Sequence, residues 1–182
     1  SPIDVDTDEG GNIYVSDSVL GAVFVFDPEG ELKGHIGEGR LHRPTGIAID
    51  HAAHRLYAVD TLRSVIEVFD LNGTYHATIG SHGGGEGQFN RPTFVALNLK
   101  GELYVSDTMN HRVQVLGSDG RFIRTFGKVG DQVGDFGSTR GIALDAEENV
   151  YVSDTLFNAL QIFDKNGQLL LVIGGNGTGR GQ

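Results

Sequence analysis

Short apolar runs recur along the whole chain, separated by polar and glycine-rich stretches. The clearest run reads IYVSDS, LYAVDT, LYVSDT and VYVSDT in four places, with aspartates Asp17, Asp60, Asp107 and Asp154 lying 43, 47 and 47 residues apart. A second run, HIG, TIG, TFG and VIG, keeps the same intervals. Two runs in phase indicate four copies of one repeat, and repeats of this length are typical of propellers and solenoids.

Each copy contains four strand-like segments. In the third copy they are FVAL from Phe94, ELYVSD from Glu102, RVQVL from Arg112 and RFIRTF from Arg121, and their Val, Ile, Phe and Tyr favour strands. A turn that ends in glycine, such as GSDG, precedes the fourth segment and lets the chain reverse as a hairpin. We therefore predict an all-β fold, a β-propeller of four-stranded antiparallel blades. The blades are expected at residues 1–37, 44–80, 92–127 and 139–174 of one domain spanning 1–182.

The residues around the two runs indicate the kind of repeat. The stretches RPTGIAID and SDTMNHRVQVL resemble NHL repeats, whose pattern is a proline before an apolar strand, then Asn-x-Tyr-Val-x-Asp, a polar loop and Arg-Val-Gln-Val-Phe. WD-type repeats need a tryptophan, and this chain has none. The fourth copy departs from the pattern, because FGSTRGIALD lacks the proline.

The resemblance implies a ring that usually has six blades. Four copies therefore predict an open arc, with residues 175–182 as the connector to a missing blade. Such an arc exposes an apolar face on each end blade, and exposed faces of this kind mark interaction sites. Further blades or another chain are thus expected against the end blades.

Composition narrows the choice of function. The chain has 14 Lys and Arg against 24 Asp and Glu, a net charge of −10, which disfavours nucleic-acid binding because that relies on neutralising phosphates. No apolar stretch is long enough to span a membrane. The absence of cysteine rules out disulfides and thiolate metal sites. It also permits an extracytoplasmic location, periplasmic, cell-surface or secreted, which the resemblance to bacterial NHL proteins suggests.

Polar side chains gather at one predicted rim, formed by the loops after the second and fourth strands. The first group is the repeated aspartate, each followed by Ser or Thr. The second group comprises candidate ligand-binding residues: Arg43, Arg91, Arg112, Arg140 and His111. One interpretation is a funnel for a ligand. The other is architectural, because an aspartate before a hydroxyl residue readily caps its own loop, and repetition in every blade favours this second interpretation.

Histidines suggest a weaker hypothesis, a metal site. Some NHL-like propellers, the peptide-amidating lyases, hold zinc through histidines, and His42, His82 and His111 are expected on the same rim. They belong to different blades and to different positions of the repeat, and no spacing of carboxylates supports them. We therefore predict no metal and no other cofactor.

Two functions remain open. No nucleophile stands beside a base at a suggestive spacing, so no catalytic residue is predicted and we favour a non-catalytic module that binds a protein or peptide as a scaffold. The alternative is a metal-dependent lyase or hydrolase of the six-bladed propeller class.

Overall fold

The computed structural model describes residues 1–175, and the expected connector at 175–182 lies outside this range except for Gly175. The described chain contains four four-stranded antiparallel sheets, each formed by consecutive strands. We call them the first to fourth blades. The first contains β1 (Pro2–Thr7), β2 (Ile13–Asp17), β3 (Ala22–Phe26) and β4 (Leu32–Ile36); the second contains β5 (Pro44–Asp50), β6 (Arg55–Asp60), β7 (Val65–Asp70) and β8 (Tyr75–Ile79). The third contains β11 (Val95–Leu97), β12 (Leu103–Asp107), β13 (Arg112–Leu116) and β14 (Phe122–Phe126); the fourth contains β15 (Thr139–Leu144), β16 (Val150–Asp154), β17 (Ala159–Phe163) and β18 (Leu169–Gly174).

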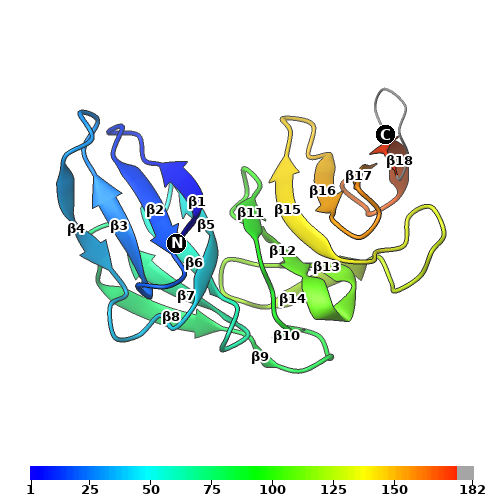
Figure 1. The fold of residues 1–182 in the computed structure, drawn as a ribbon, viewed down its shortest axis with the longest axis horizontal. Helices are drawn as coiled ribbons and strands as arrows, with labels where there is room; N and C mark the ends of the chain where they lie inside the picture. The colour runs from blue at the N-terminus through cyan, green and yellow to red at the C-terminus, as the bar shows by residue number, and fades with distance from the viewer. Residues whose placement is uncertain (176–182) are drawn as a thin grey trace.

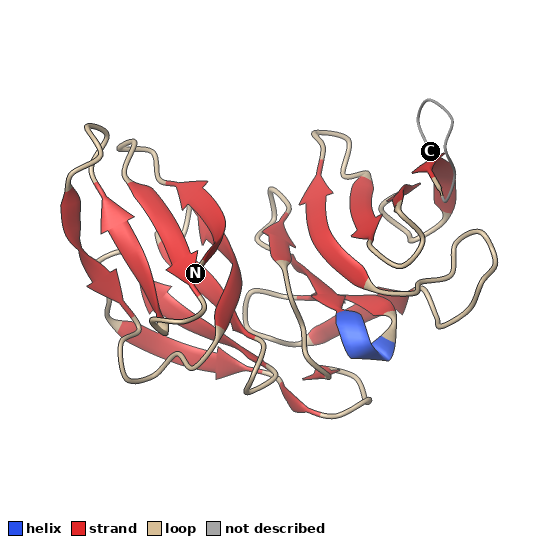
Figure 2. Cartoon of the chain, in the orientation of Figure 1, coloured by secondary structure: helices blue, strands red, loops and turns tan. Residues whose placement is uncertain are grey.

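Little else is regular. Two short strands, β9 (Ser81–His82) and β10 (Gln88–Phe89), pair in parallel in the loop before the third blade. A single turn of 3-10 helix, η1 (Thr108–Asn110), follows β12 and is the only helix drawn in Figure 2. No helix of the described chain is long and apolar enough to cross a membrane. The prediction of an all-β propeller of four-stranded blades is confirmed.

The blades follow one another along an arc (Figure 1). The innermost strands pack in the order β1, β5, β11 and β15, and no comparable packing joins β15 back to β1 among the described residues. Figure 1 shows the first and fourth blades at the two ends of this arc, apart from each other. The inner strands line a cavity of about 510 Å³. The arrangement therefore leaves one outer face of each end blade without a neighbouring blade.

The apolar core lies between the blades rather than within one central layer. Three clusters of buried side chains occupy the three interfaces between consecutive blades. Because both faces of an inner blade are covered, its strands are apolar on both sides, as in β6, where Leu56, Tyr57, Ala58 and Val59 are all buried. This explains the continuous apolar runs of the sequence, where a half-buried strand would alternate.

The repeated glycine after the fourth strand has a packing role. Gly80 and Gly127 have φ values of +82° and +85°, which only glycine adopts readily. A Cβ at either position would also collide with the ring of a buried phenylalanine in the following loop, Phe89 and Phe136 respectively. The second sequence run thus marks the point where each interblade loop turns back and inserts a buried side chain between blades, a phenylalanine after Gly80 and Gly127 and Leu41 after Gly37.

Candidate functional site

The repeated aspartates end the second strand of each blade, and their carboxylates join two loops. Oδ2 of Asp154 accepts a hydrogen bond from the N–H of Gly137 (2.7 Å), and Oδ1 accepts from Ser138 (3.0 Å), both in the loop before the blade. Oδ1 also accepts from the N–H of Leu156 (3.0 Å), in the loop after β16. Asp60 makes the same connection, with His42 N–H at 2.8 Å from its Oδ2. These two carboxylates are buried and are oriented toward backbone donors.

Asp107 holds a larger network in the third blade. Its Oδ1 accepts from the N–H of Asn90 (2.7 Å), while its Oδ2 accepts from the side chains of Asn110 (2.8 Å) and Gln114 (3.2 Å). Arg112 Nε donates to the same oxygen at 2.8 Å. The Asp107 side chain is fully buried.

Arg112 belongs to this network. Its Nη2 donates to the carbonyls of Gly85 (2.8 Å) and Gln88 (2.9 Å), which lie in the loop before the third blade. Only 15% of its side chain is exposed. Arg112 therefore clamps a loop, and it does not join the other arginines that the sequence places on the same rim.

Arg43, Arg91 and Arg140 do come together. They line one cavity of about 280 Å³, which receives residues from the second, third and fourth blades. We call this cavity the arginine mouth. Its other lining residues are Thr45, Thr61, Thr93, Thr108, Met109 and Ser138.

Three of the four threonines of the arginine mouth join one blade to the next. Thr45 Oγ1 donates to the carbonyl of Thr93 (2.6 Å), and Thr108 Oγ1 donates to the carbonyl of Thr139 (2.9 Å). Thr61 Oγ1 donates to the carbonyl of Pro92 at 2.6 Å. Each of these bonds crosses from one blade to the next. The hydroxyl residue after the repeated aspartate, at Thr61 and Thr108, is thus part of the architecture.

The three arginine side chains of the mouth are free by contrast. All three residues are exposed, and none of their guanidinium groups forms a hydrogen bond or an ion pair with a described residue. Arg91 also has a φ of +49°, a conformation that is uncommon and strained for a residue with a side chain and that gathers at functional sites. The mouth therefore carries three positive charges, and no carboxylate is among its lining residues.

The three histidines of the metal hypothesis lie in different surroundings. The His42 ring is beside the Arg40 carbonyl (3.0 Å) and lies 3.6 Å from Asp60 Oδ2. His82 is exposed in β9. His111 has a φ of +53°, and its Nδ1 is buried without a hydrogen-bond partner in the described part of the chain. Within residues 1–175, no group of three or more His, Cys, Asp or Glu side chains could hold a metal ion.

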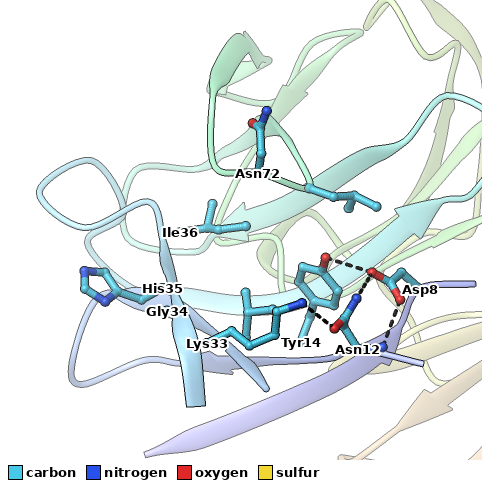
Figure 3. Close-up of a pocket in the computed structure, with 10 residues that line it drawn as sticks. Asp8, Asn12, Tyr14, Lys33, Gly34, His35, Ile36 and Asn72 are labelled. Atoms are coloured by element: carbon cyan, nitrogen blue, oxygen red, sulfur yellow. Dashed lines mark hydrogen bonds between the residues drawn. The ribbon is translucent and has the colours of Figure 1, made fainter. Parts of the chain in front are cut away.

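A larger pocket lies between the first and second blades (Figure 3), where the Asp8 carboxylate accepts hydrogen bonds from the Asn12 amide (2.7 Å) and the Tyr14 hydroxyl (3.1 Å). Lys33 Nζ donates to Asn12 Oδ1 at 2.8 Å. Burial and the hydrogen bond to Asp8 raise the pKa of Tyr14 to about 12. The same arrangement recurs in the fourth blade at Asp145, Asn149 and Tyr151, so we interpret it as a turn motif of the repeat.

A further repeated side chain, the glutamine in the middle of the third strand, is not among the residues predicted from the sequence. Gln114 accepts from the N–H of Gly87 (3.1 Å) and donates to the carbonyl of Gln88 (2.6 Å). Gln161 does the same with Gly134 (3.0 Å) and Asp135 (2.8 Å). The signal was available, because a glutamine stands at the same position of two repeats with apolar residues on either side of it, in VQVL and LQIF.

Comparison with known proteins supports the repeat and the fold. Residues 89–116 match the family model described as NHL repeat, which confirms the resemblance for the third copy. A comparison with the sequences of curated proteins gave no match.

Several solved structures are similar in fold. A structure from a nidogen/laminin complex is 20% identical, with a TM-score of 0.78 over 94% of this chain and 63% of that chain. A catalytically inactive variant of virginiamycin B lyase from Staphylococcus aureus, bound to quinupristin, is 14% identical, with a TM-score of 0.72 over 93% of this chain and 54% of that chain. A streptogramin B lyase is 12% identical, with a TM-score of 0.70 over 93% of this chain and 53% of that chain. This chain thus spans about half to three-fifths of the length of these structures, and at these identities the likeness shows the fold alone.

Proposed function

We propose that this NHL-repeat propeller is a non-catalytic binding module that takes an acidic segment of a protein or peptide at the arginine mouth. The observation that carries the proposal is the convergence of Arg43, Arg91 and Arg140 on one cavity, with no ion-pair partner for their charges among residues 1–175. Asp60, Asp107, Asp154 and Arg112, and the hydroxyls of Thr45, Thr61 and Thr108, are by contrast engaged in holding loops or blades together. The three guanidinium groups are therefore the part of this rim that is available to a ligand.

Carboxylates suit these side chains better than neutral groups do. A guanidinium presents its N–H donors in a planar fork that matches a carboxylate in two parallel hydrogen bonds. Three such groups around one cavity can hold the acidic side chains or the terminal carboxylate of a peptide. The chain as a whole carries a net charge of −10, so attraction of an acidic ligand is confined to the mouth, which favours recognition of a short segment.

The chemistry of the lining favours binding over catalysis. Apart from the arginines, the mouth is lined by threonines, one serine and one methionine. The hydroxyls of Thr45, Thr61 and Thr108 bond to carbonyl oxygens of the next blade. No histidine or carboxylate stands among the lining residues to act as a base. One of the similar solved structures is a protein–protein complex, that of nidogen and laminin, which agrees with use of this fold as a binding surface.

A charge-matched binding experiment tests the proposal. A fluorescent peptide of alternating Glu and Ser is titrated with the chain at low and high ionic strength, beside the same peptide with Gln for Glu. Binding of the acidic peptide alone is expected, weakened by salt. The triple variant Arg43→Gln, Arg91→Gln, Arg140→Gln should bind at least about tenfold more weakly, since exposed ion pairs contribute up to roughly 1 kcal/mol each.

Two controls separate the mouth from general charge effects. Arg121→Gln removes an equally exposed charge in the turn before β14 and should leave binding unchanged. Arg91→Lys should keep part of the affinity, because it keeps the charge and loses the planar fork. Equal binding of both peptides, or equal loss in Arg121→Gln and the triple variant, would exclude the arginine mouth as the binding site.

The alternative of a metal-dependent lyase or hydrolase rests on the lyases of similar fold. The candidate histidines do not converge in the described chain, so this hypothesis would need ligands other than His42, His82 and His111. Elemental analysis of the purified chain by mass spectrometry tests it, because stoichiometric zinc or calcium would favour the alternative. Extracytoplasmic location is likewise a proposal, and it predicts that the full-length gene product is found outside the cytosolic fraction.

A further inference from the structure

The three interfaces inside the arc follow one rule. One blade contributes a tyrosine of its second strand and an apolar residue of its fourth strand, which we call its trailing face. The next blade contributes an apolar pair from its second and third strands, which we call its leading face. The trailing residues Tyr14 and Ile36 pack with the leading pair Leu56 and Phe69; Tyr57 and Ile79 pack with Leu103 and Leu116; Tyr104 and Phe126 pack with Val150 and Phe163.

The first blade has a leading face of the same kind that no neighbouring blade of the described chain covers. Ile13 pairs with Phe26 across β2 and β3, in the register in which Leu56 pairs with Phe69 in the second blade. Leu56 and Phe69 are buried, whereas Ile13 and Phe26 are only partly buried. Val5, on the neighbouring strand β1, is 60% exposed.

The direction of Val5 follows from its neighbours in β1. The carboxylates of Asp4 and Asp6 accept hydrogen bonds from the N–H groups of Ile47 (2.9 Å) and Ile49 (2.8 Å) in the second blade. Successive side chains of a strand point to opposite faces. Val5 therefore points away from the second blade and extends the uncovered leading face.

The fourth blade has a trailing face that no blade of residues 1–175 covers. Ile173 pairs with Leu160, in the register in which Ile36 pairs with Val23 in the first blade. Ile36 is 4% exposed under its neighbouring blade, whereas Ile173 is 49% exposed. Leu171, on the same face of β18, is 52% exposed.

The two uncovered faces are complementary to each other. The trailing face of the fourth blade carries the types of residue that cover a leading face at each of the three internal interfaces. The leading face of the first blade carries the pair Ile13 and Phe26, which is the type of pair that such residues cover. We propose that a second copy of this chain binds here, with its first blade packed on the fourth blade of the first copy. The contact is head to tail, so assembly either closes into a ring or continues as a chain of molecules.

Hydrodynamic measurements on the 182-residue chain test this proposal. Sedimentation velocity over a range of concentrations should show species above the monomer mass of 19.5 kDa that increase with concentration. Val5→Lys blocks the leading face and Ile173→Lys blocks the trailing face, so each variant alone should sediment as a monomer. Leu171→Lys also places a charge on the trailing face, so this variant should sediment as a monomer too. Leu99→Lys, at a 96% exposed leucine in a turn of the third blade, should assemble as the wild type does.

A mixing experiment distinguishes head-to-tail contact from other modes. Val5→Lys keeps its trailing face and Ile173→Lys keeps its leading face, so an equimolar mixture should form a dimer that does not grow further. Circular dichroism should show that every variant keeps the β spectrum of the wild type, since the replaced side chains are about half exposed or more. A wild-type chain that stays monomeric at all concentrations would overturn the proposal. So would assembly of either variant alone, because two like faces would then suffice, or a mixture that stays monomeric.

Discussion

Replacing Asp107 by alanine tests how the repeated aspartate stabilises a blade. The buried carboxylate accepts hydrogen bonds from the Asn90 N–H and from the side chains of Asn110, Arg112 and Gln114. Alanine removes all four acceptor interactions at once. It also leaves a positive charge, that of Arg112, without its carboxylate in a position that is only 15% exposed.

The expected loss follows from two contributions. Losing a side-chain cap on a backbone N–H costs about 1–2 kcal/mol. Removing one partner of a buried ion pair costs about 3–5 kcal/mol, but Arg112 keeps the carbonyls of Gly85 and Gln88 as acceptors, which offsets part of this. We therefore expect Asp107→Ala to lower the free energy of unfolding by about 3 kcal/mol.

Urea denaturation at neutral pH measures this loss. The midpoint should fall while the slope with denaturant stays unchanged, which indicates a change in stability alone. Asp107→Asn keeps an acceptor for the Asn90 N–H and should lose less. Asp17→Ala is the matched control at the same repeat position, where the carboxylate is more exposed and lacks an arginine or glutamine partner, so its effect should be smaller. An Asp107→Ala chain that unfolds at the wild-type midpoint would refute the structural role.

Two further predictions concern the blade architecture. Gly80→Ala should destabilise the chain by about 1 kcal/mol or more, because it forces a side chain into a positive φ and against the Phe89 ring; a thermal melt unchanged from the wild type would contradict this. Tyr14 should titrate near pH 12, since its pKa is raised to about 12 by burial and by the hydrogen bond to Asp8. A raised pKa means that this stabilisation is complete below the unfolded value of about 10 and is lost as the pH rises through 12. Ultraviolet titration of the wild type and of Tyr14→Phe measures this pKa, because the difference between the two curves is the ionisation of Tyr14. A difference that appears near pH 10 would contradict the prediction.

Much of the fold could be predicted from the sequence because the same pattern of four strands occurs in four copies. The runs ending at Asp60 and Asp107 share a spacing with the glycines Gly80 and Gly127, and such agreement fixes which segments are equivalent strands. Equivalent strands in consecutive units must pack face to face, which gives the blades and the interfaces between them. The sequence shows that these glycines recur in phase. The structure shows why glycine is required there, because a Cβ at either position would collide with a phenylalanine ring.

The candidate site could be predicted only in part. Arg43 and Arg91 precede the proline of their repeats, and this shared position brings them to one mouth, with Arg140 beside them. The sequence places Arg112 on the same rim, but its side chain turns to Asp107 and to the loop before its blade. Which way a rim side chain turns depends on the backbone path of the loop, as at His111 with its φ of +53°. The spacing of the repeats along the sequence does not determine that backbone path.

Binding of an acidic ligand at the arginine mouth can be observed at the guanidinium groups themselves by NMR of the arginine side chains. The chain is labelled with ¹⁵N and titrated with the peptide of alternating Glu and Ser, and the Nε–Hε resonances are followed, assigned by single Arg→Lys variants. We predict that the resonances of Arg43, Arg91 and Arg140 shift together and saturate. The resonances of Arg112 and Arg124, which hydrogen-bond within the protein, should stay in place. Unchanged resonances for the three mouth arginines, or equal shifts for all five, would contradict it.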